Sequence, residues 1–193
     1  MSQTVFKFDV NHDYSPENFL VSSSNREAFE HIKSFPWNFY ALSIHGPKAS
    51  GKTYLANILA AKSNAIIIED INSQTPQVEL LHTLNKVKET NGHVLLTSEK
   101  PLNKLGFALP DLVSRLSAIV SVHIDKPDAE IFHLLFARYF AARQLKVSDD
   151  VIAYLAGRVE RSFLGATQAV EKIDKLSLEQ KRNITIPLVK QVI

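Results

Sequence analysis

The sequence predicts an α/β fold with a parallel sheet, followed by an all-helical C-terminal unit. Short apolar runs alternate with amphipathic helical segments as far as residue 125, which is typical of a parallel sheet covered on both faces. From Lys126 onward only helical periodicity remains. We therefore expect an arm at residues 1–10, an α/β base at residues 11–125 and a helical lid at residues 126–193.

Four strands are expected in the base, because four short runs are rich in aliphatic residues, as buried parallel strands are. The first runs directly into a glycine-rich loop, and the second ends at two carboxylates. The runs are Phe39–Ile44, Ala65–Ile68, His93–Thr97 and Ala118–Ile124.

Helices are expected between and after these strands, where apolar residues recur at helical spacing. In the base they cover Asn25–Ser34, Lys52–Lys62 and Val78–Glu89. In the lid, Asp128 and Ser148 are suited to cap two helices and Ser162 to begin a third, because their side-chain oxygens can accept from free N–H groups. A last short helix is expected near Thr185–Pro187, with proline in its first turn.

Composition excludes several classes of function. The 193 residues carry 22 basic and 20 acidic side chains, a balance that gives no support for a nucleic-acid surface. Absence of cysteine excludes disulfides and thiolate metal sites. No apolar run approaches the roughly 20 residues that cross a bilayer. We expect a cytoplasmic protein with no membrane contact.

A phosphate-binding motif follows the first strand. Its residues are Gly46, Pro47, Lys48, Ala49, Ser50, Gly51, Lys52 and Thr53, a full match to G-x-x-x-x-G-K-[ST]. Between a strand and a helix, such a loop turns its N–H groups toward a phosphate chain, while the lysine reaches the terminal phosphates and the threonine ligates Mg²⁺. A chance match is the alternative, but the flanking strand and helix argue against it. ADP or ATP with Mg²⁺ is the predicted ligand.

Two carboxylates stand only 17 positions after the loop lysine. Glu69 and Asp70 leave the end of a predicted strand, where parallel sheets present ligands. One acid would hold Mg²⁺ together with Thr53, a role we assign to Glu69, and Asp70 would orient the attacking water. Two solvated acids are the alternative. A glutamate at the metal position and a Cβ at Ala49 favour nucleotide binding over fast turnover.

Several further segments occur in a specific order along the chain. They are Asn18–Val21, His82–Asn85, Thr97–Pro101, Pro110–Leu116, Lys126–Asp128 and Arg161-Ser162. Together with the loop, they resemble the AAA+ ATPases of the DnaA branch, and more closely the Hda family of DnaA-related regulators. The resemblance implies an AAA+ P-loop base, an adenine-side segment at Phe19, Leu20 and Val21, a catalytic Glu99, and an arginine finger at Arg115.

The chain departs from the family pattern in three places. The strand and helix that normally separate the phosphate loop from the carboxylate strand are missing, so we expect a shortened sheet with the Ala65 strand at its edge. The second-sensor position falls on Gly165, and Arg161, one turn earlier, is either its replacement or a solvated helix residue. No DNA-binding domain follows the lid, so direct sequence-specific DNA binding is not expected.

The N-terminal arm fits the outline of the peptide by which Hda proteins dock on the DNA polymerase sliding clamp. Gln3 would bond at the rim of the clamp groove, and Val5, Phe6 and Phe8 would supply the apolar contacts. The alternative is an edge strand that packs on this protein's own core.

The resemblance implies a regulator of replication initiation. On the sliding clamp it would promote hydrolysis of DnaA-bound ATP, with Arg115 offered in trans, and would thereby prevent re-initiation. Clamp and DnaA are the expected partners, and self-association is compatible with the sequence. A small P-loop kinase acting on a metabolite is the alternative, and a scaffold that has lost its nucleotide is a third possibility, against which the intact Gly51-Lys52-Thr53 argues.

Overall fold

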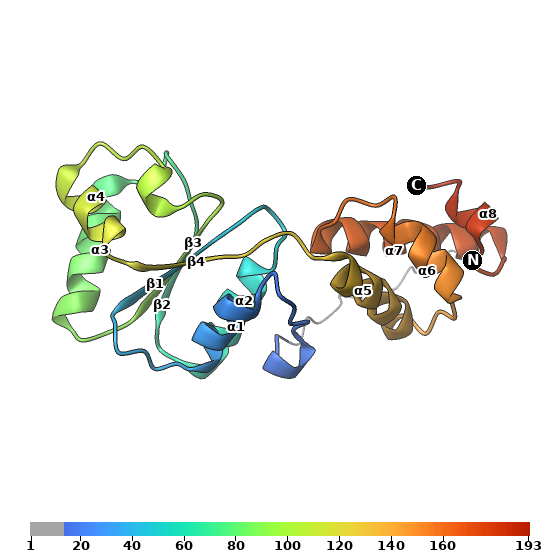
Figure 1. Cartoon of the computed structure of the whole chain (residues 1–193), viewed down its shortest axis with the longest axis horizontal. Helices are drawn as coiled ribbons and strands as arrows, with labels where there is room; N and C mark the ends of the chain where they lie inside the picture. Colours follow the sequence, from blue (N-terminus) through green and yellow to red (C-terminus); the bar gives the residue numbers. More distant parts are fainter. Residues whose placement is uncertain (1–13) are drawn as a thin grey trace, which may run out of the picture.

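The computed structural model describes residues 14–193 and has the predicted combination of a parallel α/β base and a helical C-terminal region (Figure 1). The arm expected at residues 1–10, with Gln3, Val5, Phe6 and Phe8, lies outside the described residues. Within the described part of the chain, no helix is both long and apolar enough to cross a membrane.

Four parallel strands form the sheet, in the order β2-β3-β1-β4. They are β1 (Ala41–His45), β2 (Ile66–Ile71), β3 (Val94–Ser98) and β4 (Val120–His123). Strand β1 is central and pairs with both β3 and β4, so that the carboxyl ends of β1, β3 and β4 lie side by side. The predicted four-stranded sheet, with the second strand at its edge, is therefore confirmed.

Helices cover both faces of the sheet. Two pack on one face, α1 (Arg26–Lys33) and α2 (Lys52–Lys62), and two on the other, α3 (Gln77–Glu89) and α4 (Pro110–Ser117) (Figure 1). Because side chains alternate along a strand, β1 feeds both cores: Leu42 and Ile44 join α1 and α2, whereas Ala41 joins α3 and α4. Two 3₁₀ turns complete the base, at Pro16–Asn18 and Leu102–Lys104.

The base differs from expectation in two elements. Helix α4 contains the segment Pro110–Leu116, which resembles the family's arginine-finger segment but for which no helix was predicted. The available signals were proline at the first position and two leucines four residues apart, Leu112 and Leu116. Strand β2 continues through the two carboxylates to Ile71, because a register shift between Ile68 and Ile71 lets pairing with β3 resume.

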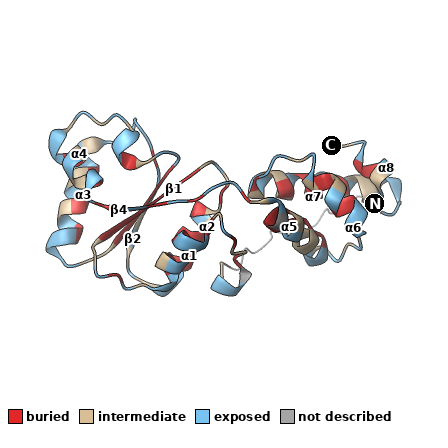
Figure 2. Ribbon diagram, in the orientation of Figure 1, coloured by how far each residue is buried: buried red, intermediate tan, exposed pale blue. Residues whose placement is uncertain are grey.

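The second strand is also less buried than its apolar run suggested. Ile66 is 41% exposed, and Ile67 and Ile68 are partly buried. An edge strand has a neighbour on one side only, and within residues 14–193 the neighbour of β2 is β3. By contrast, every residue of β3 is buried (Figure 2).

Four helices make up the C-terminal region: α5 (Ala129–Ala142), α6 (Asp149–Ala156), α7 (Phe163–Gln180) and α8 (Ile186–Val189). They enclose a core of their own, and buried segments of α5, α6 and α7 are red in Figure 2. Phe132, Phe136 and Phe140 are fully buried in it. Two predicted caps are confirmed: Asp128 Oδ1 accepts from Ile131 N at 2.8 Å, and Ser162 Oγ accepts from Gly165 N at 2.9 Å. Ser148 stands at the N-cap of α6 but makes no side-chain capping bond.

Candidate functional site

The phosphate-loop segment is packed between the carboxyl ends of the strands. Gly46 N donates to Ser98 O at 3.2 Å, and Ile124 N donates to His45 O at 2.8 Å. A Cβ on Gly46 would lie 2.1 Å from the carbonyl oxygen of Ile124, so only glycine fits there. At the other end of the loop, Gly51 has a φ of 101° and serves as the N-cap of α2. These two glycines therefore set the course of the loop.

Ala49 connects this loop to the helical region. Its carbonyl accepts a hydrogen bond from Phe163 N, the first residue of α7, at 3.1 Å. Its own φ is 53°, in the left-handed region that disfavours residues with a Cβ. The loop is thus held in a strained conformation at the point where base and lid touch.

Replacing Ala49 with glycine is expected to stabilise the protein by about 1 kcal/mol, because the strain of the left-handed residue is removed and exceeds the added chain entropy. Urea denaturation measures the difference. The matched control is Ala61→Gly at an exposed position of α2, which should destabilise by about the same amount because glycine is a poor helix former. Equal destabilisation by both substitutions would contradict the strain argument.

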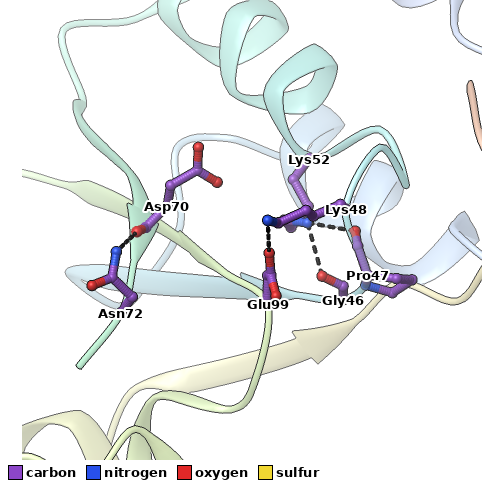
Figure 3. A network of polar contacts seen from close by, with 7 residues as sticks. All are labelled: Gly46, Pro47, Lys48, Lys52, Asp70, Asn72 and Glu99. Carbon is purple, nitrogen blue, oxygen red and sulfur yellow. Dashed lines mark hydrogen bonds and ion pairs between the residues drawn. The ribbon is translucent and has the colours of Figure 1, made fainter. Parts of the chain in front are cut away.

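Lys52 is buried at the start of α2 and points back over its own loop. Its ammonium donates to Gly46 O at 2.8 Å and to Pro47 O at 2.7 Å (Figure 3). Burial lowers the pKa of Lys52, while the nearby Asp70 and Glu99 carboxylates act in the opposite direction. The side chain is therefore fixed at the loop, with two acids close enough to favour its charge.

The two carboxylates of β2 are not equivalent. Asp70 has a φ of 55°, and its N–H donates to Thr97 Oγ1 at 3.0 Å. Its carbonyl accepts from Asn72 Nδ2 at 2.9 Å (Figure 3). This irregular backbone places Asp70 on the wall of the cavity described below, together with Thr53. Glu69 is exposed and does not line that cavity. Its predicted role as the Mg²⁺ ligand stays a prediction.

Glu99, the third predicted acid, follows β3 directly. Its carboxylate lies 3.3 Å from Lys48 Nζ, in an exposed ion pair across the mouth of the loop (Figure 3). An exposed pair of this kind contributes little to stability, about 1 kcal/mol at most. Both side chains line the cavity, so either can reorganise toward a ligand without a large penalty.

A cavity of about 1400 Å³ opens between the loop and the lid. This volume exceeds the roughly 300–1,000 Å³ of most small-molecule pockets, so it can hold a nucleotide. The predicted residues that line it are Phe19, Leu20, Lys48, Ala49, Gly51, Lys52, Thr53, Asp70 and Glu99. The remaining predicted loop residues Gly46, Pro47 and Ser50 do not line the cavity, and Val21 packs on the core.

Aromatic rings support the N-terminal side of the cavity. Phe19 stacks on Phe29 with ring centroids 5.3 Å apart, and it also contacts the Tyr54 ring at 5.3 Å. Tyr14 packs edge-on against Tyr54 at 5.1 Å. This apolar wall suits a planar base, as the adenine-side prediction for Phe19 and Leu20 requires.

The lid contributes cavity residues that the sequence reasoning did not select. From α5 these are Arg138 and Tyr139, with Arg143 directly after it, and from α7 Thr167 and Glu171. Arg143 Nη2 lies 3.5 Å from Glu171 Oε1, and burial raises the pKa of Tyr139, which bonds to Thr167. Leu135, Tyr139 and Arg143 are spaced four residues apart, which was the available signal for one helix face.

The backbone at Gly165, the predicted second-sensor position, leaves no room for an arginine side chain. A Cβ there would lie 2.6 Å from the carbonyl oxygen of Glu160 and 3.0 Å from Ser162 Oγ, so the position requires glycine. Arg161 is exposed and does not line the cavity. Among the described residues, the lid arginines on the cavity wall are Arg138 and Arg143.

Arg115 lies on α4, away from the cavity. Its Nε is 3.3 Å from Asp111 Oδ1, one helical turn earlier, and the side chain is 30% exposed. In the isolated chain this arginine is therefore held in an ion pair. A purely structural ion pair is the alternative to the predicted role of Arg115 as an arginine finger. A finger acts on a neighbouring molecule's nucleotide, so a position away from the chain's own cavity is compatible with that role.

His45 adjoins the loop and makes the free energy of unfolding depend on pH. Its ring lies 4.9 Å from that of His123, and its Nδ1 is 3.2 Å from Ser121 Oγ. Burial lowers the pKa of His45 below its ordinary 6.5, and His123, Lys104 and Lys52 act in the same direction. The folded protein therefore binds this proton less readily than the unfolded chain does.

The free energy of unfolding is accordingly expected to fall as the pH drops below about 6.5, and to be fully retained above it. The decrease in the free energy of unfolding per pH unit should be smaller in His45→Gln. Denaturation by urea at a series of pH values checks this, with the exposed His82→Gln on α3 as the control. An unchanged slope in His45→Gln would show that another group carries the pH dependence.

Solved structures identify the fold. The chain is similar to domain III of Thermotoga maritima DnaA, with a TM-score of 0.81 and 19% identity, covering 93% of this chain and 95% of that one. It is also similar to AMPPCP-bound DnaA from Aquifex aeolicus, with a TM-score of 0.72, 22% identity, and coverage of 90% and 69%. A Thermotoga maritima RuvB structure follows at a TM-score of 0.70 and 13% identity, covering 92% and 70%. The chain therefore has the fold of an AAA+ P-loop base with a helical lid.

Proteins of similar sequence indicate which AAA+ proteins this chain resembles. Residues 128–193 match the family model described as "Hda, lid domain". The chromosomal replication initiator protein DnaA of Lacticaseibacillus casei is 27% identical over 127 residues, which cover 64% of this chain but only 28% of that protein. The C-terminal region is thus similar to the Hda lid domain, and the chain is similar in sequence to DnaA proteins, in agreement with the resemblance seen in the sequence.

One relative matches over nearly its whole length. A Haemophilus influenzae protein described as uncharacterized is 27% identical over 216 residues, covering 93% of this chain and 90% of that protein. Because this alignment is longer than the 193-residue chain, the relative contains segments that this chain lacks.

Proposed function

We propose that the cavity binds ADP or ATP with Mg²⁺ and turns the nucleotide over slowly. Lys52 and Thr53 start the helix that faces the cavity, and Asp70 lines it from β2, so the residues present fit a phosphate chain with its metal. The similar Aquifex aeolicus DnaA structure is AMPPCP-bound, which supports an adenine nucleotide as the ligand. Mg²⁺ would neutralise phosphate charge, while this chain's residues bind and orient the nucleotide.

We further propose that the protein is a cytoplasmic regulator of replication initiation. Docked on the polymerase sliding clamp, it promotes hydrolysis of ATP bound to DnaA and does not read DNA sequence itself. The observation that carries this proposal is the Hda lid match over residues 128–193, on a chain whose phosphate loop is intact. The structural likeness to DnaA domain III supports a side-by-side AAA+ contact between the two proteins.

A hydrolysis assay tests the proposed function directly. Radiolabelled ATP bound to DnaA is followed with clamp loaded on DNA, with and without this protein. Release of DnaA-bound phosphate should accelerate only when both clamp and protein are present. The protein alone should stay below about 1 s⁻¹, the low end of ordinary enzyme rates. Unchanged DnaA hydrolysis would refute the regulatory role.

The arm supplies a separate prediction. Replacing both Gln3 and Phe6 with alanine is expected to weaken clamp binding at least tenfold, since loss of an anchor residue costs more than about 1 kcal/mol. Co-purification with clamp and titration measure the loss. The control replaces Asn11 and His12, which lie on the same segment outside the predicted motif. Equal binding by both double variants would remove the arm from the clamp contact.

The kinase alternative retains one supporting observation. A P-loop kinase needs arginines over the phosphates, and Arg138 and Arg143 of the lid do line the cavity. The fold comparisons favour DnaA instead. Nucleotide retained on purification together with clamp binding supports the regulator, whereas phosphoryl transfer to a small metabolite would support the kinase.

A further inference from the structure

The lid wall of the cavity carries polar side chains that the proposed function does not use. Tyr139 of α5 bonds to Thr167 of α7. Arg143, directly after α5, donates from Nη2 to Glu171 Oε1 at 3.5 Å. Because both contacts join positions 28 residues apart, α5 and α7 lie side by side in parallel, and the second contact is one helical turn beyond the first.

The separation of these contacts from the phosphate loop follows from the course of α7. The helix begins at the loop, where Phe163 N donates to Ala49 O at 3.1 Å. Thr167 is four residues further along α7 and Glu171 is eight, which corresponds to about 6 and 12 Å along the helix axis. The cavity therefore has a second cationic position, at the partner of Glu171, about two helical turns away from the loop.

The guanidinium of Arg143 is suited to bind an anion at this position. It has five N–H donors, whereas the carboxylate of Glu171 accepts from Nη2 at a distance near the limit for a hydrogen bond. The Arg143 side chain is only 20% exposed, so its charge is stabilised by a closer anion than this carboxylate provides. Glu171 is 57% exposed and can rotate into solvent at little cost. An incoming phosphate can therefore replace it.

The cavity as a whole is cationic. Among the described residues on its wall, six side chains are basic and three are acidic. In the proposed complex, Mg²⁺ would offset part of the charge of a 5′-diphosphate, so a diphosphate alone does not balance the wall. The volume of about 1400 Å³ also exceeds that of most small-molecule pockets. Charge and volume both indicate a ligand with more anionic groups than ADP.

We propose that this ligand is a nucleotide with an additional phosphate on its ribose, at the 2′ or the 3′ position. The inference rests on the proposed function, because the 5′-phosphates occupy the loop at Lys52. Arg143 binds the ribose phosphate, since its planar guanidinium can contact two phosphate oxygens at once. An arginine has the same role in dinucleotide-binding folds, where it accommodates a phosphorylated ribose.

The parts of such a nucleotide match separate regions of the cavity. The loop at Lys52 receives the 5′-phosphates, and the aromatic wall at Phe19 receives the base. The ribose joins these two parts, so a phosphate on its 2′ or 3′ oxygen projects away from both. The lid wall, with Thr167 and Arg143, lies opposite the base domain across the same cavity. A ribose phosphate can therefore meet Arg143 while the diphosphate stays on the loop.

Glu171 is expected to oppose this binding. Its carboxylate repels a phosphate and competes with it for Arg143, whereas it can accept a hydrogen bond from a free ribose hydroxyl. Glu171→Gln removes the charge and keeps the shape of the side chain. This substitution should raise the preference for the ribose-phosphorylated nucleotide by about two- to fivefold, the effect of one exposed charge. A lowered preference would contradict the assigned competition.

Calorimetric titration of the 193-residue chain in the presence of Mg²⁺ measures the preference. The probes are ADP and ADP that carries a 3′-phosphate, and the 2′-phosphate isomer is titrated beside them. At least one phosphorylated probe should bind about tenfold or more tightly than ADP, the effect of one charge-assisted arginine contact. Arg143→Ala should bring the ratio of the two affinities close to one.

The matched control is Arg158→Ala. It removes another lid arginine, which packs on the Tyr154 ring at 3.8 Å and does not line the cavity. The affinity ratio should be retained in this variant. Each result compares two affinities of the same variant, so ADP binding itself shows that the variant is folded. Loss of the ratio in both arginine variants, or its retention in both, would overturn the assignment of Arg143.

The outcomes separate this inference from the proposed function. Tight binding of ADP with a ratio near one in the parent protein would overturn the ribose-phosphate site and leave the nucleotide proposal standing. Absence of binding by every probe would refute the nucleotide proposal and this inference with it. Inorganic phosphate titrated into the ADP complex distinguishes a free anion. Phosphate binding that Arg143→Ala abolishes would assign the position to free phosphate and overturn the ribose assignment.

Discussion

Arg115→Ala is expected to abolish the stimulation of DnaA-bound ATP hydrolysis, with a rate loss of about 10³-fold or more, because an arginine finger contributes about 10³–10⁵ in related systems. The guanidinium would stabilise charge developing on the transferred phosphoryl group of the neighbouring nucleotide. Nucleotide binding by the variant should be unchanged, since Arg115 does not line the chain's own cavity. Single-turnover hydrolysis by DnaA, with clamp on DNA, measures the effect.

The ion pair in the structure provides the matched control. Asp111 lies 3.3 Å from Arg115, and Asp111→Ala breaks the same pair while leaving the arginine in place. Such a helical pair contributes only about 0.3–0.5 kcal/mol to stability, so both variants should fold. If Asp111→Ala lost stimulation as fully as Arg115→Ala, the arginine would have a structural role in that pair. Full stimulation by Arg115→Ala would refute the finger assignment outright.

Phe136→Ala is expected to lower the free energy of unfolding by about 3–5 kcal/mol, the cost of deleting a fully buried aromatic side chain and leaving a cavity. The ring is fully buried and packs on Phe132, with centroids 5.0 Å apart. A loss of this size is a large part of the roughly 5–15 kcal/mol that stabilises a typical domain. Urea denaturation gives the difference.

The control for this substitution lies on the same helix. Leu134 of α5 is 49% exposed, and Leu134→Ala should change stability by no more than about 0.5 kcal/mol. Nucleotide affinity should fall in Phe136→Ala as well, because Leu135 and Tyr139 on either side of it line the cavity. Similar stability of the two variants would contradict the assignment of Phe136 to the lid core.

Local patterns were enough to predict most of the base. A strand, a glycine loop and a helix identify themselves within one continuous stretch, Phe39–Lys62, because the apolar run and the glycines are contiguous. The four-stranded sheet also followed from the sequence, since the short gap between Lys62 and Ala65 leaves no room for another strand and helix. Helix α4 was not predicted because its signals are few: a proline start and two leucines one turn apart within eight residues.

The candidate site was predictable only in part. Contiguous motifs located Lys52, Thr53 and the β2 carboxylates, but not which of the two acids enters the cavity. That distinction depends on the left-handed backbone at Asp70 and on its bond to Thr97, a residue 27 positions away. Likewise, nothing near Arg143 in sequence indicates that α5 faces the phosphate loop.

The sequence by itself determined the class of protein, the order of its elements and the identity of its phosphate loop, because each depends on neighbours along the chain. Only the tertiary structure decided which side chains share the cavity, that Gly46 must be glycine, and which of the two β2 acids lines the cavity. These features depend on contacts between residues far apart in sequence: Gly46 with Ile124, Ala49 with Phe163, and Asp70 with Thr97.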